Sequence, residues 1–480
     1  MASSSIVVHA PSGTLKRSMK LLGALLITLS GITPASSVFI IAPGVIEEAG
    51  SGAFLSFFAA AIVGVLMAYV YAELSSAFPL AGGEYAVVGR VLGPLPGFLL
   101  LGLTVATMIL SVAVIALGVA TYLGSVLPNL PTATTAAVTV AVSTLIATLN
   151  VRTNAAVTGI FLAVEIISLL ALSVLGFAHV TRPLSALVLH PVILDSAGAL
   201  AVAPISAVGL ATAVAIFAYN GYGQAVYFGE EMHDAPRQIA RTILWALAIA
   251  VLAEFVPVTA MLLGAPRLKD LLGSQNMIGD FITARGGAGL NTVMSLAIAL
   301  AIFNAAIAIL LQASRLLFST GRDEVWTPGL NRLLASTHPR FNSPWGATVV
   351  SGVVCAMACY VNERFLLVVT GTTLVAIYAA LCIAAIAGRR GGSTRHGVYR
   401  MPLFPLPPVV AAVALVYVIY ANWQDRVIGR PSLYATAALV VISGAYYMIV
   451  LRRRGHWVFH GPTGEPTDAP SEDRGVQTLC

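Results

Sequence analysis

Long apolar stretches dominate the chain, and short polar segments separate them. A helix needs about 20 mostly apolar residues to cross a bilayer, and twelve stretches approach or exceed that length. They lie at 21–46, 52–78, 95–126, 134–149, 154–178, 205–229, 240–264, 288–319, 346–361, 365–387, 405–423 and 433–451. The pattern predicts an all-α membrane protein with about twelve transmembrane helices, of which 134–149 and 346–361 are the shortest.

Composition supports a membrane protein and excludes several other classes. Of the 480 residues, 58% are hydrophobic and only 10% are charged, whereas soluble domains carry about 25% charged residues. Such a chain cannot cover a water-facing surface, which excludes a soluble enzyme and a disordered regulator. The net charge is +6, but the arginines form no single stripe, so we expect no nucleic-acid partner.

The distribution of lysine and arginine predicts the orientation in the membrane. With twelve spans both termini lie on one side, and 19 of the 26 basic residues fall on that side. Cytoplasmic loops carry the excess of Lys and Arg, so both termini are expected in the cytoplasm. Arginine far outnumbers lysine, which is typical of a GC-rich bacterial gene and favours a bacterial inner (cell) membrane.

Two spans carry signals of a broken helix near their centres. The first contains Gly31 and Pro34, followed by Ser36 and Ser37, and the sixth contains the turn pair Asn220-Gly221. A broken helix in lipid is tolerated only where it lines a cavity or is buried in protein. Interrupted helices in corresponding positions of two halves indicate a transporter binding site.

Three motifs give the chain a resemblance to a known family. They are Ala35-Ser36-Ser37-Val38-Phe39 with Pro43; Tyr71-Ala72-Glu73-Leu74 through Phe78-Pro79 to Gly82-Gly83-Glu84-Tyr85; and Ala313 to Phe318 with Gly321-Arg322-Asp323 and His338-Pro339-Arg340-Phe341. The chain resembles the amino acid–polyamine–organocation (APC) transporters over most of residues 20–390. The resemblance implies two inverted five-helix repeats with discontinuous helices 1 and 6, plus two extra helices.

This fold gives the expected domain organisation. A cytoplasmic tail at 1–20 precedes a transporter core at 21–390, whose repeats are 21–178 and 205–387. Two additional transmembrane helices occupy 391–451, and a cytoplasmic tail follows at 452–480.

The resemblance also implies which residues bind substrate. The first broken segment is similar to a cradle for a substrate carboxylate, and the sixth-span segment receives the amine. The candidates are Ala35, Ser36 and Ser37 for the carboxylate, and Thr33, Phe217, Ala218 and Asn220 for the amine and nearby side chain. Ala35 and Ser37 replace the family's usual glycines, so the backbone approaches a ligand less closely, and this leaves room for an amine without a carboxylate.

Aromatic residues border the second break. Phe217 matches the position of the family's aromatic gate over the substrate. Tyr219 and Tyr222 flank the break, where they can stack on a cationic group or simply pack.

Two acidic residues, Glu165 and Glu254, fall near the middle of apolar spans. Intramembrane carboxyls are costly and are usually neutral, paired or functional. Some family members carry a lysine near the position of Glu165, where it replaces sodium. Glu165 is therefore a candidate for proton coupling or for pairing with a cationic substrate; the plainer alternative is a neutral carboxyl bonded to the backbone. Glu254 and Asn304 are additional candidates, and because the eighth span offers only Asn304 and no Ser/Thr pair, protons are favoured over sodium.

These observations favour a proton-coupled secondary transporter that imports an amino acid or related amine by alternating access. A polyamine or monoamine importer, or a substrate:product exchanger, remains an alternative of the same fold. A non-transporting membrane sensor and a membrane-embedded enzyme are alternatives from other classes. The sequence contains no metal, cofactor or nucleotide motif. The loop 126–131 lacks cysteine, so no disulfide-linked heavy-chain partner is expected.

Overall fold

The computed structural model describes residues 15, 17–124, 130–149, 151–195, 197–274, 276–424, 426, 429–454 and 457. Part of the loop 126–131 and most of both predicted tails therefore lie outside the described residues. The α-helices are α1 (Leu21–Ile32), α2 (Pro34–Ser36), α3 (Ala42–Ala49), α4 (Ala53–Ala77), α5 (Glu84–Leu92), α6 (Pro94–Gly124), α7 (Thr132–Ala147), α8 (Val151–Phe177), α9 (Ser185–Val188), α10 (Ile205–Ala218), α11 (Ala235–Gly264), α12 (Leu268–Leu272), α13 (Met277–Arg322), α14 (Pro328–Leu334), α15 (Trp345–Ala358), α16 (Glu363–Gly391), α17 (Leu406–Gln424), α18 (Gly429–Tyr446) and α19 (Arg452–Arg454).

Short elements of other geometry complete the fold. Two π-helical segments are η1 (Ser37–Ile41) and η4 (Tyr447–Leu451), and two 3₁₀ segments are η2 (Gly50–Gly52) and η3 (Tyr222–Glu231). The strands β1 (Val192–Leu194) and β2 (Leu200–Val202) form one antiparallel hairpin, with Ile193 opposite Ala201.

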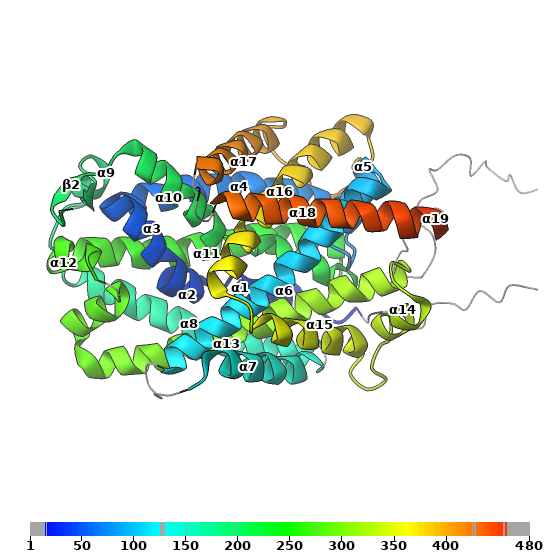
Figure 1. The fold of residues 1–480 in the computed structure, drawn as a ribbon, viewed down its shortest axis with the longest axis horizontal. Helices are drawn as coiled ribbons and strands as arrows, with labels where there is room; N and C mark the ends of the chain where they lie inside the picture. The colour runs from blue at the N-terminus through cyan, green and yellow to red at the C-terminus, as the bar shows by residue number, and fades with distance from the viewer. Residues whose placement is uncertain are drawn as a thin grey trace, which may run out of the picture.

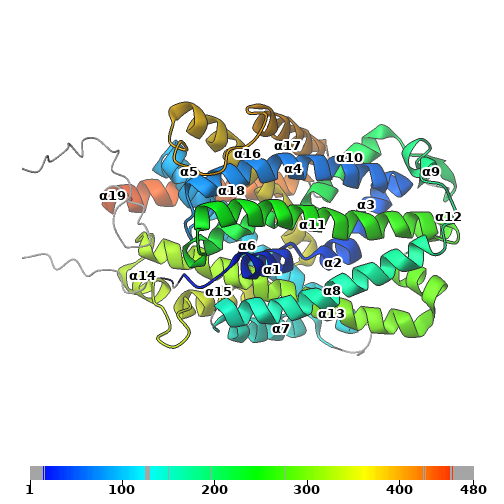
Figure 2. The ribbon, with the colours of Figure 1, turned by 180° about the vertical axis from the view of Figure 1, so that it is seen from behind.

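Several of the long helices run along the long axis of the molecule. Helices α4, α11, α8 and α13 lie nearly lengthwise in two opposite views, with α5, α14 and α19 at one end and α9, α12 and the hairpin at the other (Figures 1 and 2). Helices α8 and α11 approach closely at two glycines. A Cβ on Gly176 would lie 2.2 Å from the Ala260 carbonyl oxygen, and one on Gly264 would lie 2.4 Å from the Gly176 carbonyl oxygen. Small residues at such contacts are how membrane helices pack.

The described part of the chain contains nine helical segments that are long and apolar enough to cross a membrane. The first, Leu21–Ala77, covers the first two predicted spans, whereas the predicted spans at 134–149 and 346–361 correspond to the shorter helices α7 and α15. The side chains of Ile160, Ile167 and Val174 are 65–69% exposed along one face of α8. Such an apolar stripe needs lipid around it, so the protein is a multi-pass membrane protein.

The predicted start of the eighth span coincides with a kink in helix α13. Helix α13 is interrupted at Gly287, where φ is 82°, a value that glycine adopts without a Cβ clash. The predicted eighth span begins at residue 288, directly after this kink. Residues 277–286 form a preceding helical segment that the sequence analysis did not predict.

Three buried ion pairs link helices near the end of the molecule that carries α5. Glu73 pairs with Arg389 at 2.6 Å. Glu230 pairs with Arg322 at 2.7 Å, and Glu231 with Arg315 at 3.0 Å. Removing one partner of such a pair leaves an uncompensated buried charge, so these contacts fix the packing of α4 against α16 and of η3 against α13.

Candidate functional site

The first break lies between α1 and α2. Thr33 adopts a left-handed conformation with φ 57° and ψ 63°, and Pro34 begins the next helical segment. Pro34 has no backbone N–H and prevents α1 from continuing through this position. The chain then passes through η1 into α3, so what the hydropathy pattern shows as one span is two offset helical pieces.

The second break follows Ala218 at the end of α10. Gly221 has φ 118°, and η3 starts at Tyr222. A Cβ on Gly221 would lie 2.9 Å from the Cα of Ile32. Only glycine allows the two breaks to come this close.

A hydrogen bond also joins the two breaks. The Ser37 hydroxyl donates to the carbonyl oxygen of Ala218 at 2.7 Å. That carbonyl lies at the C-terminal end of α10, where helices leave their last carbonyls without an internal partner. The sequence therefore places a hydroxyl on one broken segment where the other needs a donor.

A cavity of about 90 Å³ lies beside the two breaks. Six of the predicted site residues line it: Thr33, Ser36, Ser37, Phe217, Ala218 and Asn220. Its other walls include Ser111 and Gly118 of α6 and Thr370 of α16. The volume exceeds the ~10–15 Å³ that a water molecule occupies by the same kind of measure, so the cavity can admit a small solute.

Glu165 of α8 is hydrogen-bonded to the first break. The Ala35 N–H donates to Oε1 of Glu165 at 2.7 Å, and Glu165 is fully buried. The second carboxyl oxygen, Oε2, has no hydrogen-bond partner among the described residues. Ala35 does not line the cavity, and its N–H, which we expected to face a substrate carboxylate, is bound to Glu165 instead.

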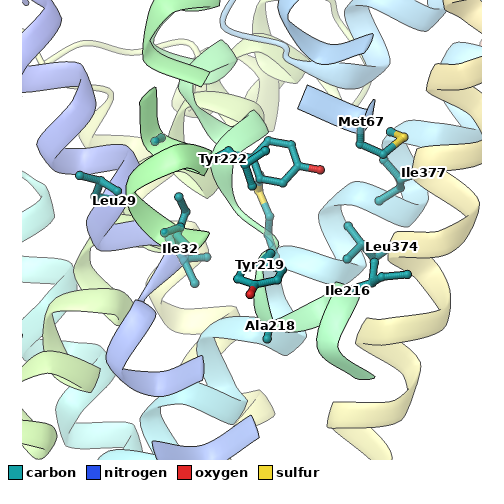
Figure 3. Close-up of a cluster of buried hydrophobic side chains, with 14 of the residues drawn as sticks. Leu29, Ile32, Met67, Ile216, Ala218, Tyr219, Tyr222, Leu374 and Ile377 are labelled. Atoms are coloured by element: carbon teal, nitrogen blue, oxygen red, sulfur yellow. The ribbon is translucent and has the colours of Figure 1, made fainter. Parts of the chain in front are cut away.

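Tyr219 and Tyr222 point away from the cavity and into the packed interior. Figure 3 shows both side chains between Leu29 and Ile32 of α1 and Leu374 of α16. Tyr219 packs edge-on against Phe57, with ring centroids 5.8 Å apart. Both tyrosines are therefore packed in this structure, and stacking on a ligand stays a prediction.

Glu254 is buried behind the first break. It lies close enough to Ser37 and Glu165 to interact with both, and neither of its carboxyl oxygens has a hydrogen-bond partner in the described structure. The Tyr219 hydroxyl nearby and the Ser36 hydroxyl are also without partners there. Unpaired buried polar atoms usually mark bound water, an ion or a functional group.

Asn304 lies against the first break from α13. Its side-chain amide donates to the Ser30 hydroxyl at 2.9 Å and to the Thr158 carbonyl at 3.3 Å. The Ser30 hydroxyl also donates to the Thr158 carbonyl, at 3.3 Å. Asn304 thus joins α1, α8 and α13 but does not line the cavity.

Two glutamines next to the break were not among the predicted residues. A Cβ on Gly31 would lie 2.5 Å from the Gln224 Oε1 and 2.5 Å from the Gln312 Nε2. Gln224 lines the cavity, and Gln312 is fully buried on α13 without a hydrogen-bond partner in the part of the chain that the structure describes. Gln312 interrupts the apolar run Ile309-Leu310-Leu311, the same signal that identified Glu165 and Glu254.

Among the described residues, no group of three or more His, Cys, Asp or Glu side chains lies close enough to hold a metal ion.

Comparison with known proteins gives the family. The family model described as amino acid permease matches residues 19–449. The chain belongs to the amino acid permease family. This confirms the resemblance inferred from the motifs, and it makes the protein a transporter and not an enzyme.

Individual relatives of this permease transport different solutes, according to their names. The chain is 26% identical to the branched-chain amino acid permease of Lactococcus lactis over 81% of this chain and 86% of the relative. It is 25% identical to the methylthioribose transporter of Bacillus subtilis, covering 85% of this chain and 90% of that protein. It is 29% identical to the human Asc-type amino acid transporter 1, covering 74% and 68% of the two chains.

Proposed function

We propose that the protein is a proton-coupled symporter that imports an amino acid or a related amine across a bacterial inner membrane. The two broken helices carry this proposal, because they meet beside a cavity lined by predicted substrate-binding residues. The proposed architecture has twelve transmembrane helices, with inverted repeats at 21–178 and 205–387 and two extra helices. Both termini face the cytoplasm, and one bundle rocks against the rest to expose the cavity alternately to each side.

The substrate's carboxylate is assigned to the segment after the first break. Ser36 supports this assignment, because it lines the cavity and its buried hydroxyl lacks a partner among the described residues. Ser37 lies beside it, although its hydroxyl already donates to Ala218.

The substrate's amine is assigned to the second break. Asn220 lines the cavity, and its Oδ1, which accepts a 2.7 Å hydrogen bond from Tyr378, has a second lone pair for an ammonium donor. Thr33 and Ala218 border the same space, and Phe217, which also lines it, is the proposed gate.

An amine without a carboxylate is the second candidate substrate, and one observation favours it. The Ala35 N–H, a donor that a carboxylate would need, is bound to Glu165. The site then offers fewer donors to an anion, while Glu165 adds negative charge close by. Fewer donors for an anion together with a nearby negative charge would suit a polyamine or monoamine importer, or an exchanger of an amino acid for its amine.

Glu165 is the proposed proton-coupling residue. Its ionised carboxyl accepts the Ala35 N–H and so holds the first broken segment against α8. Protonation weakens Oε1 as an acceptor, and the segment is then free to move with its substrate. Glu254, which interacts with Glu165, is proposed to share in this proton transfer, and Asn304 bonds Ser30 beside the same break.

Uptake by the purified protein in liposomes tests the proposal. An inside-alkaline pH gradient should drive accumulation of a radiolabelled amino acid or its amine, and a sodium gradient alone should not. A membrane sensor or membrane enzyme would move no radiolabel, and sodium-driven accumulation would overturn the assignment of protons.

A further inference from the structure

A second cavity adjoins the first on the side of α5. It has a volume of about 40 Å³, and Ser111, Asn220, Gln224 and Ile309 line both cavities. The volume exceeds the ~10–15 Å³ needed for one water molecule. We call this space the inner chamber; its remaining walls come mainly from α4, α5, α6, η3 and α16.

Glu84, the first residue of α5, forms the charged wall of the inner chamber. The Tyr71 hydroxyl donates to its Oε1 at 3.2 Å, and the Tyr227 hydroxyl donates to its Oε2. All three side chains are buried and line the chamber. The two hydroxyls leave the carboxylate with lone pairs to spare, since each oxygen accepts more than one hydrogen bond.

The backbone is shaped to hold both tyrosine rings in place. A Cβ on Gly83 would lie 2.3 Å from the Tyr227 ring, and one on Gly223 would lie 2.4 Å from the Tyr71 ring. Tyr71 also packs edge-on against Tyr222 and Tyr378, with centroids 5.9 and 5.8 Å apart. The geometry around Glu84 is therefore fixed by close packing.

Glu84 differs from three other buried acids at this end of the molecule. Glu73, Glu230 and Glu231 are each paired with an arginine. The ion pairs and hydrogen bonds of the described residues give Glu84 no cationic partner. A buried carboxylate costs free energy unless it is paired, and tyrosine rings around it attract cations.

We propose that Glu84, Tyr71 and Tyr227 form a second binding site for the ammonium group of the substrate, which the substrate occupies on its way between the central cavity and the α5 end of the molecule. The proposal rests on the proposed transport function. Asn220 lies at the junction of the two cavities and is assigned to the same ammonium group in the central cavity. The substrate thus passes its ammonium group from the Asn220 amide oxygen to the Glu84 carboxylate.

Equilibrium binding of radiolabelled methylammonium to the purified protein tests this site, because methylammonium is the smallest ligand with the relevant charge. Glu84→Gln keeps the size and one acceptor but removes the charge, so we expect about tenfold or greater loss of affinity, because hydrogen bonds to charged groups are stronger than those to neutral groups. Unchanged affinity in this variant, or no saturable binding by the wild type, overturns the proposal.

A matched pair of tyrosine variants separates the site from general packing. Tyr227→Phe removes a hydroxyl that bonds Glu84, whereas Tyr85→Phe removes one that bonds Ser319 and Asp323. Methylammonium affinity should fall in Tyr227→Phe and stay at the wild-type value in Tyr85→Phe. Equal effects of the two substitutions would show that only packing is involved.

The pH dependence of this binding gives an independent readout. Burial raises the pKa of the Glu84 carboxyl, and the hydrogen bonds from Tyr227 and Tyr71 partly offset the rise. Tyr378 is the other ionisable side chain that interacts with this carboxyl. Binding should therefore weaken as the pH falls, and in Tyr227→Phe it should weaken at a higher pH because the ionised form has lost a donor. An identical pH profile in the two proteins contradicts the site.

Exchange of internal for external substrate in liposomes separates this proposal from the proposed function. If the wild type exchanges neither amino acids nor their amines, the transport function fails, whatever Glu84 does. If the wild type and Glu84→Gln exchange at the same rate, the Glu84 site is overturned and the transport function stands.

Discussion

The Ala35 N–H donates a 2.7 Å hydrogen bond to the side chain of Glu165, which lies on a helix 130 residues further along the chain. This contact joins the first broken helix to α8 inside the membrane. It places a titratable group on the segment that is expected to bind substrate. Proton binding and substrate binding can therefore influence each other through one hydrogen bond.

Replacing Glu165 with glutamine tests this coupling. Glutamine keeps an oxygen acceptor for the Ala35 N–H but cannot take up a proton at pH 5–9. We expect pH-driven uptake to fall about tenfold or more, the effect of losing an interaction of about 1.4 kcal/mol, while substrate binding is largely retained. Uptake and equilibrium binding should be measured on the same preparation. Unchanged pH-driven uptake would remove Glu165 from the coupling mechanism.

Neighbouring serines after the first break should respond differently to loss of their hydroxyls. Ser37→Ala leaves the buried Ala218 carbonyl without its donor, and an unsatisfied buried group costs about 1–3 kcal/mol. The variant should have a lower melting temperature. Ser36→Ala removes a hydroxyl that has no partner in the described structure, so it should keep the melting temperature but bind substrate more weakly. The reverse pattern would contradict the assignments of both serines.

Gly221 should tolerate no side chain, because the two breaks touch there. In Gly221→Ala the new Cβ would meet the backbone of Ile32 at 2.9 Å, at a φ of 118°. Loss of transport with reduced thermal stability is the expected result. Gly198→Ala is the control, because Gly198 also has a positive φ, 71°, but nothing lies within 4 Å of its added Cβ. If the two variants lose transport and thermal stability equally, backbone strain alone explains the loss, and the close contact between the two breaks does not contribute.

Removing only one partner of the buried pair Arg315 and Glu231 should destabilise the protein more than removing both. Both side chains are at most 3% exposed, and removing one partner of a buried pair costs about 3–5 kcal/mol. Arg315→Met should strongly lower the melting temperature, and adding Glu231→Met should recover much of the loss. A double variant that is as unstable as the single one would show that the arginine acts through its other contacts.

The sequence was sufficient to locate both breaks, since their causes are local. Pro34 cannot continue a helix, and Asn220-Gly221 favours a turn, whatever surrounds them. The intramembrane position of Glu165 was equally visible, because a carboxyl interrupts an apolar run. The motifs then identified the family, which the family model confirms.

Contacts between distant segments were not predictable from these local signals. Nothing in the neighbourhood of Ala35 indicates that its N–H is bound to Glu165, and nothing near Gly31 indicates the two glutamines packed against it. Likewise, Tyr219 and Tyr222 have the sequence pattern of ligand-stacking residues, but the packing of α1 and α16 against them turns both into the core (Figure 3). Such outcomes depend on which helices become neighbours.

A thermal-shift comparison of amino acids with their decarboxylated amines tests the central claim most directly, because a ligand that binds the folded protein raises its melting temperature. The account predicts that some matched pair stabilises the wild-type protein, and that the stabilisation shrinks in Ser36→Ala, because Ser36 lines the cavity and its hydroxyl has no partner among the described residues. Stabilisation by the amino acid alone would favour the carboxylate cradle, and stabilisation by the amine as well would favour the amine importer. If no amino acid or amine stabilises the protein, or if Ser36→Ala is stabilised as strongly as the wild type, the cavity beside the two breaks is not the substrate site.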